Sequence, residues 1–96
     1  MAKFGFDSEK LVTLCRQSDA SMVAVFGSRA RGDAGPLSDI DVMIRFAKPK
    51  SLLSLIRLER ELSAALGTKV DLVTEQAISP YLIDRIRQDL TVLYEA

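Results

Sequence analysis

The sequence predicts an α/β fold, in which residues 1–96 form a single small domain of helices packed on a mixed β-sheet. Three observations lead to this prediction. The chain has 96 residues, 48% of them hydrophobic, which suffices for one small core. Its apolar pattern switches between the helical period of 3.6 and the strand period of two. The expected order is helix, strand, strand, helix, strand, helix, strand, and this alternation favours a sheet covered by helices.

A helix and a buried strand are expected first. Residues 7–19 predict a helix capped by Asp7 or Ser8, with an apolar stripe of Leu11, Val12 and Cys15. Residues 21–27 form a short apolar run with β-branched side chains, which predicts a buried strand.

A second strand is expected at residues 39–46, because two sets of side chains alternate there. The apolar set is Ile40, Val42, Ile44 and Phe46, and the opposite set is Asp39, Asp41, Met43 and Arg45. This period of two predicts a half-buried strand. The preceding residues 32–36 have the composition of a turn.

The second half of the chain predicts two more helices and two more strands. Residues 51–67 form a helix that stops at Gly67, with an apolar face of Leu52, Leu55, Ile56, Leu62 and Leu66. Residues 69–74 form a strand with Asp71 opposite its apolar side. Ser79 and Pro80 begin a helix whose inner face is Leu82, Ile83, Ile86 and Leu90, and residues 91–96 form a closing strand.

Composition excludes several function classes. Thirteen basic and thirteen acidic residues give a formal net charge of zero, so no direct nucleic-acid binding or membrane-surface binding is expected. No apolar run approaches the ~20 residues of a membrane span. The chain lacks histidine and has only Cys15, which removes imidazole catalysis, disulfide frameworks and cysteine-based zinc sites. The expected location is the cytoplasm.

Two aspartates on one strand are the strongest candidates for chemistry. Residues i and i+2 of a strand share a face and lie about 7 Å apart at Cα, so the carboxylates of Asp39 and Asp41 can converge on a cation. Oxygen ligands favour Mg²⁺ or Mn²⁺, which usually take further ligands from substrate phosphates. Asp71 completes a three-carboxylate site if its strand is a neighbour in register.

The loop before this strand offers donors for phosphate. Gly27 allows close backbone approach, and Ser28 adds a hydroxyl. Arg29 and Arg31 can neutralise phosphate charge. Carboxylates for metals and donors for a triphosphate are the parts of a phosphoryl- or nucleotidyl-transfer site. Each part alone has a plainer interpretation: a solvated aspartate pair, a turn, surface arginines or an exposed strand residue.

With these residues in hand, the sequence resembles the nucleotidyltransferases of the DNA polymerase β superfamily. The motif G-S-x-A-R-G-x5-S-D-x-D is met in full by Gly27, Ser28, Ala30, Arg31, Gly32, Ser38, Asp39 and Asp41. Asp71 matches the third family carboxylate. The short length is similar to that of the minimal nucleotidyltransferase (MNT) antitoxins found beside HEPN-domain toxins in prokaryotes.

The resemblance implies a polymerase β palm-like fold and transfer of AMP from ATP to a tyrosine of a cognate HEPN toxin. It implies two Mg²⁺ or Mn²⁺ ions held by Asp39 and Asp41, with Asp71 completing the site and helping to deprotonate the acceptor. Gly27 and Ser28 then hold the triphosphate. Arg31 matches the motif, whereas a phosphate contact by Arg29 is an inference from its charge. Two other functions stay open: an antitoxin that masks its toxin without essential catalysis, and a nucleotidyltransferase acting on a small molecule.

Overall fold

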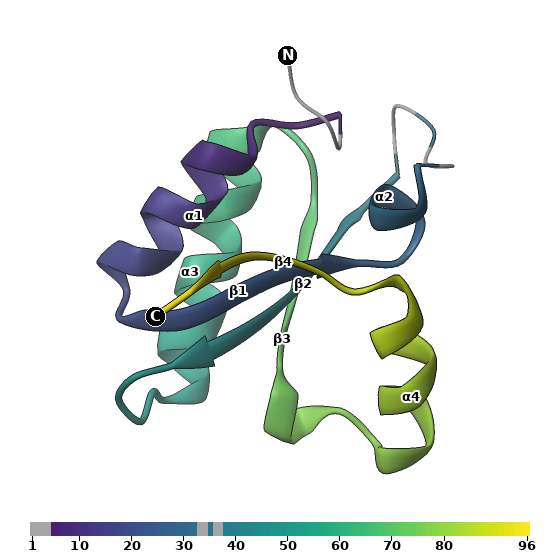
Figure 1. Cartoon of the computed structure of the whole chain (residues 1–96). Helices are drawn as coiled ribbons and strands as arrows, with labels where there is room; N and C mark the ends of the chain where they lie inside the picture. Colours follow the sequence, from purple (N-terminus) through teal and green to yellow (C-terminus); the bar gives the residue numbers. More distant parts are fainter. Residues whose placement is uncertain (1–4, 33–34, 36–37) are drawn as a thin grey trace.

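The computed structural model describes residues 5–32, 35 and 38–96, and these form a sheet with helices on both faces (Figure 1). The order of elements is α1 (Ser8–Gln17), β1 (Ala20–Phe26), α2 (Ser28–Arg31), β2 (Ile40–Phe46), α3 (Leu52–Leu66), β3 (Val70–Thr74), the 3-10 turn η1 (Glu75–Ala77), α4 (Pro80–Asp89) and β4 (Thr91–Glu95). The seven expected elements are confirmed. The turn expected at residues 32–36 lies mostly outside the described residues.

The helix ends follow the expected capping chemistry. The side chain of Asp7 accepts a hydrogen bond from the backbone N–H of Lys10 at the start of α1. Ser51 and Ser79 cap α3 and α4 in the same way. Gly67 ends α3 in the left-handed conformation, which glycine adopts without steric cost.

The sheet is mixed, as predicted, with the strand order β3-β2-β1-β4. β1 pairs antiparallel with β2 and with β4, whereas β2 and β3 are parallel. Helix α3 makes the connection between the two parallel strands. The register of β2 and β3 sets Asp41 opposite Asp71.

The main core lies between the sheet and helices α1 and α3, which cover one face (Figure 1). Leu11 and Cys15 of α1 and Leu62 of α3 are fully buried there. Burial raises the pKa of the Cys15 thiol to about 12. The expected stripe on α1 is therefore confirmed.

The other face of the sheet is packed at its centre, so the expectation that β2 is half-buried is wrong at Met43, whereas Asp41 is only partly buried and Arg45 is exposed. Met43 is 2% exposed and clusters with Met22 and Ala24 of β1. Helix α4 covers this cluster with Ile83 and Ile86, which sequence alternation in β2 alone does not reveal. Leu82, expected on the inner face of α4, is 51% exposed instead.

Helix α3 packs on a stripe that confirms the expected Leu55, Leu62 and Leu66 but not Leu52 and Ile56. Its buried residues are Leu58 and Leu62, flanked by Leu55 and Leu66. The predicted residues Leu52 and Ile56 are exposed, as is Leu53. The stripe that packs follows spacings of three and four residues, which place side chains over one another on a helix.

Polar side chains of α3 complete the hydrogen bonding of the edge strand β3. The Glu59 carboxylate accepts a hydrogen bond from the Leu72 N–H at 2.8 Å, and the Ser63 hydroxyl accepts one from the Val70 N–H at 2.9 Å. These bonds satisfy backbone donors that an edge strand otherwise leaves free. Across the described residues, no helix has both the length and the apolar character needed to cross a membrane.

Candidate active site

Three carboxylates lie at the same end of two adjacent strands, where β2 and β3 begin. Asp41 on β2 is the register partner of Asp71 on β3. Asp39 comes just before β2 begins, and the Ile40 N–H donates to the Lys69 carbonyl at 2.9 Å. The strand adjacency on which the sequence argument for Asp71 depended is therefore present.

The surroundings of Asp41 disfavour its charged form. Burial raises the pKa of Asp41, and repulsion from Asp71 and Asp39 raises the pKa further, while Arg31 opposes the shift. A carboxyl group with these neighbours ionises reluctantly unless a cation is added.

Lys69 supplies one such cation. Its ammonium lies 3.9 Å from the nearer Asp39 oxygen and 3.7 Å from the nearer Asp71 oxygen. The side chain of Lys69 is 68% exposed, so both ion pairs are weak and easily exchanged. Sequence reasoning missed Lys69, although its place two residues before Asp71 on one strand was a signal.

Gly27 faces the central carboxylate across a short gap. A methyl group added at Gly27 would lie 2.5 Å from an Asp41 carboxylate oxygen. Gly27 has φ +75° and ψ −154°, a backbone region that is essentially restricted to glycine. The motif glycine is therefore required twice, by its backbone angle and by the closeness of Asp41.

Ser28 follows as the first residue of α2 and is half-buried. Gly32 ends this one-turn helix at φ +81° and donates its N–H to the Ser28 carbonyl. The short turn thus places Ser28 directly after Gly27, which faces the Asp41 carboxylate.

The two arginines of α2 lie in different environments. Arg31 is exposed, and its guanidinium pairs with Asp89 at the end of α4 at 2.9 Å. The charge of Arg31 also acts on Asp41. Asp89 was not among the residues predicted for the site, and its sequence separation of 58 residues from Arg31 left no local signal.

Arg29 is buried, with 6% exposure. Its Nε and Nη2 donate to the Ser38 carbonyl at 3.3 and 2.7 Å, and its Nη1 donates to the Gly5 carbonyl at 3.5 Å. The Ser38 hydroxyl accepts a hydrogen bond from the Gly35 N–H. The Arg29 guanidinium therefore bonds to the carbonyl of Ser38, the residue before Asp39, and to that of Gly5.

The donor set fits a hard divalent cation in its chemistry, since it consists of three carboxylates: Asp39 and Asp41, two residues apart, and Asp71, the register partner of Asp41. Burial raises the pKa of Asp41, and repulsion from Asp71 and Asp39 raises it further; a bound cation would offset that repulsion. In the described residues, however, no three His, Cys, Asp or Glu side chains converge closely enough to form a ligand group. Binding therefore requires the aspartates to rotate and Lys69 to withdraw.

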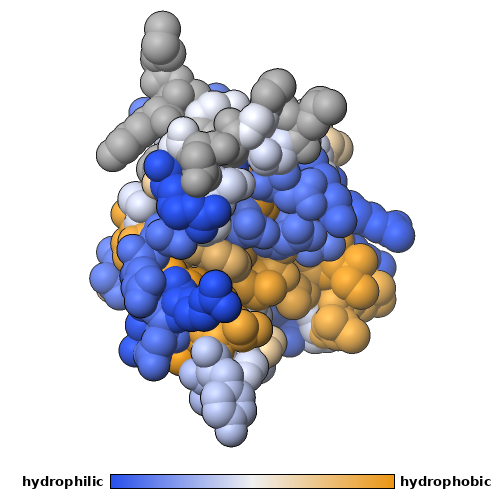
Figure 2. Space-filling view, turned by 90° about the vertical axis from the view of Figure 1, so that its right-hand side faces the viewer, coloured by the Kyte–Doolittle hydropathy of each residue, from blue (hydrophilic) through white to orange (hydrophobic). Residues whose placement is uncertain are grey.

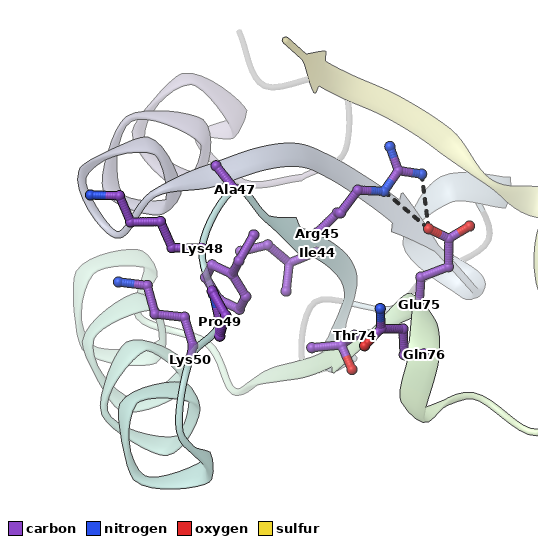
Figure 3. Close-up of a pocket in the computed structure, with 10 residues that line it drawn as sticks. Ile44, Arg45, Ala47, Lys48, Pro49, Lys50, Thr74, Glu75 and Gln76 are labelled. Atoms are coloured by element: carbon purple, nitrogen blue, oxygen red, sulfur yellow. Dashed lines mark hydrogen bonds and ion pairs between the residues drawn. The ribbon is translucent and has the colours of Figure 1, made fainter.

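A hollow of about 490 Å³ lies elsewhere, at the opposite end of β2 and β3 from the carboxylates. Figure 3 shows Arg45 turned toward Glu75, to which Nε and Nη2 donate at 3.1 and 2.8 Å. Lys50, on the other side of the hollow, is paired with Asp19 at 2.7 Å. Arg45 and Lys50 are two of the three cationic side chains that line the hollow, and both are already paired. The hollow is therefore expected to bind anions more weakly than its composition suggests.

Comparison with known proteins agrees with the geometry. The model of the nucleotidyltransferase domain family matches residues 8–93. The chain therefore belongs to the nucleotidyltransferase family, and the expected fold is confirmed.

Within this family the chain resembles short members. A protein of Methanocaldococcus jannaschii, assigned as a protein adenylyltransferase, is 40% identical over 77 residues, which cover 80% of this chain and 83% of the relative. A solved structure assigned as a minimal nucleotidyltransferase is 36% identical, has a TM-score of 0.76, and is matched over 86% of this chain and 85% of its own. A crystal structure of a toxin–antitoxin with AMP-PNP is 25% identical, with a TM-score of 0.84 over 94% of this chain and 74% of its own.

Proposed function

We propose that this chain is a metal-dependent nucleotidyltransferase antitoxin that transfers AMP from ATP to a tyrosine of a cognate HEPN toxin. The observation that carries the proposal is the register pair of Asp41 and Asp71, with Asp39 beside it and Gly27 against it. The toxin–antitoxin structure with AMP-PNP and the adenylyltransferase relative support the choice of nucleotide and of a protein acceptor.

In the proposed reaction the acceptor hydroxyl attacks the α-phosphorus of ATP. The new O–P bond forms as the bond from the α-phosphorus to the bridging oxygen breaks, and pyrophosphate leaves. Asp39, Asp41 and Asp71 would hold two Mg²⁺ or Mn²⁺ ions, and these would supply positive charge that neutralises the phosphates and lowers the pKa of the attacking hydroxyl. Asp71 accepts the proton of that hydroxyl.

The remaining residues hold the triphosphate. Gly27 lets its oxygens approach the backbone next to Asp41, and Ser28 donates its hydroxyl. Arg31, exposed and close enough to act on Asp41, supplies positive charge once it leaves Asp89. Because the salt bridge to Asp89 is exposed, this exchange is inexpensive.

The proposal is tested by mixing the purified chain with Mg²⁺, α-labelled ATP and the HEPN protein encoded beside it. The expected result is label on a toxin tyrosine, lost in Asp41→Asn and retained in Asp84→Asn, which changes an exposed aspartate of α4. Equal labelling by wild type and Asp41→Asn would overturn the proposal. Labelling of an added small alcohol without any toxin would favour the small-molecule alternative.

A second candidate function is neutralisation by binding alone, and one observation favours it. Large apolar side chains are exposed on α3, α4 and β4, among them Leu52 (72%), Leu53 (59%) and Leu82 (51%). Figure 2 shows apolar surface on the side of the molecule that carries α4. If Asp39→Asn combined with Asp41→Asn still protects cells from the toxin at normal expression, masking is the main mechanism.

A further inference from the structure

Arg29 ties together three parts of the chain that meet beside the candidate active site. The residue belongs to α2 and is 6% exposed. It donates hydrogen bonds to the carbonyl of Ser38, just before β2, and to that of Gly5, before α1. The hydrogen bond from Nη2 to the Ser38 carbonyl, at 2.7 Å, lies one residue from Asp39. The guanidinium therefore acts on the backbone that carries a candidate metal ligand.

The geometry is that of a fixed clamp. Nε and Nη2 converge on one oxygen, a fork that only a guanidinium can present. A buried positive charge is costly unless its donors are satisfied, and here the carbonyls of Ser38 and Gly5 accept hydrogen bonds from Nε, Nη1 and Nη2. Moving Arg29 to a phosphate would give up these bonds, so a direct contact with the nucleotide is disfavoured by energy as well as by burial.

Gly5 provides independent support for the clamp. It has φ +79°, and a methyl group added there would lie 2.7 Å from Arg29 Nη1. The next residue, Phe6, is 6% exposed and packs in the main core. The segment before α1 is thus anchored on one side by Phe6 and held against Arg29 on the other.

We propose that Arg29 is a positioning residue that fixes Asp39 through the Ser38 carbonyl, and that it does not contact the nucleotide. The proposal rests on the proposed function, because it assigns Arg29 a part in placing one carboxylate of that site. A displacement of about 1 Å at a reacting centre can cost on the order of 100-fold in rate. Loss of the clamp is therefore expected to lower turnover while leaving ATP affinity nearly unchanged.

The test compares Arg29→Met and Arg29→Lys with Arg57→Met, which removes an exposed arginine of α3. Three quantities are measured for each: the unfolding temperature, the affinity for Mn²⁺ without ATP by electron paramagnetic resonance, and kcat and KM for ATP in the transfer assay. For Arg29→Met we expect Mn²⁺ affinity to fall, kcat to fall roughly tenfold or more, and KM to stay within about threefold. Millimolar guanidinium should restore part of the lost turnover, while Arg57→Met behaves as wild type.

A rise in KM with unchanged kcat would overturn the proposal, because it would mean that Arg29 binds the nucleotide directly. Wild-type kcat and Mn²⁺ affinity in folded Arg29→Met would also overturn it. If that variant does not fold, Arg29→Lys decides, since its single ammonium cannot form the fork and must show an intermediate loss. If wild type transfers no AMP but its Mn²⁺ affinity still depends on Arg29, the proposed function fails and the positioning role stands.

Discussion

Gly27→Ala is the sharpest single perturbation of this site. The added methyl group would lie 2.5 Å from an Asp41 carboxylate oxygen, whereas ordinary contact begins near 3.4 Å, so one of the two must move by about 0.9 Å. A displacement of that size at a reacting carboxylate costs on the order of 100-fold in rate. The backbone angle of φ +75° adds a folding penalty of roughly 1–3 kcal/mol.

Gly67→Ala is the matched control for this variant. Gly67 also has a positive φ, +68°, but nothing lies within 4 Å of the added methyl group. Both variants should therefore lose stability in urea denaturation, by roughly 1–2 kcal/mol for Gly67→Ala. Only Gly27→Ala should lose AMP transfer to the toxin, measured with labelled ATP below the unfolding transition. A folded Gly27→Ala that transfers at more than a third of the wild-type rate would refute the reasoning.

Three further predictions follow from the charges and hydrogen bonds of the structure. Asp41→Asn should raise the unfolding temperature in EDTA at pH 7.5, because the pKa of Asp41 is raised in the folded state and the wild-type protein therefore loses stability as the pH rises through that pKa. The increase in unfolding temperature should shrink toward pH 4. An unfolding temperature equal to or below that of wild type at pH 7.5 contradicts this prediction. Lys69→Met should bind Mn²⁺ more tightly in the absence of ATP, measured by titration with electron paramagnetic resonance, because the substitution removes the cation that pairs with Asp39 and Asp71. Unchanged affinity would show that Lys69 does not compete with Mn²⁺ for these carboxylates. Glu59→Ala should lower the free energy of unfolding in urea by about 1–3 kcal/mol, because it leaves the Leu72 N–H of the edge strand unpaired. Glu61→Ala, which changes an exposed residue of the same helix, should be nearly neutral. Equal losses in the two variants would show that the Glu59 hydrogen bond does not stabilise the edge strand.

Local periodicity accounts for most of the elements that the sequence predicted correctly. Capping residues and turn glycines set the ends of α1 and α3, and alternation identified β2. The meeting of Asp41 and Asp71 was conditional on strand order, which local patterns do not encode. The parallel pairing of β2 and β3 across α3 supplies that missing condition.

Features set by distant contacts were predicted less well. Met43 was assigned to an exposed side because its burial depends on α4, forty residues further along the chain. The stripe predicted on α3 included Leu52 and Ile56, which are exposed, and omitted Leu58, which packs in the core; here the spacing of Leu55, Leu58 and Leu62 was a usable signal. Periodicity predicts the exposure of side chains least well near the ends of a helix, because exposure there depends on what lies beyond the sheet.

Local helix geometry could have predicted that the two arginines of α2 differ in their surroundings. Successive helical residues are separated by about 100°, so Arg29 and Arg31 point to nearly opposite sides of the turn. Equal roles for both were therefore improbable from spacing alone. Which of the two is buried became clear only with Ser38 and Gly5 in place.

The central claim is that Asp39, Asp41 and Asp71 jointly hold divalent cations beside Gly27. A crystal grown with Mn²⁺ and a non-hydrolysable ATP analogue tests this directly through the anomalous scattering of manganese. We expect manganese peaks within about 2.3 Å of carboxylate oxygens of Asp39 and Asp41, one of them shared with Asp71, and the analogue's phosphates beside Gly27. Manganese bound away from these aspartates, or an Asp71 that faces no ion, would contradict it.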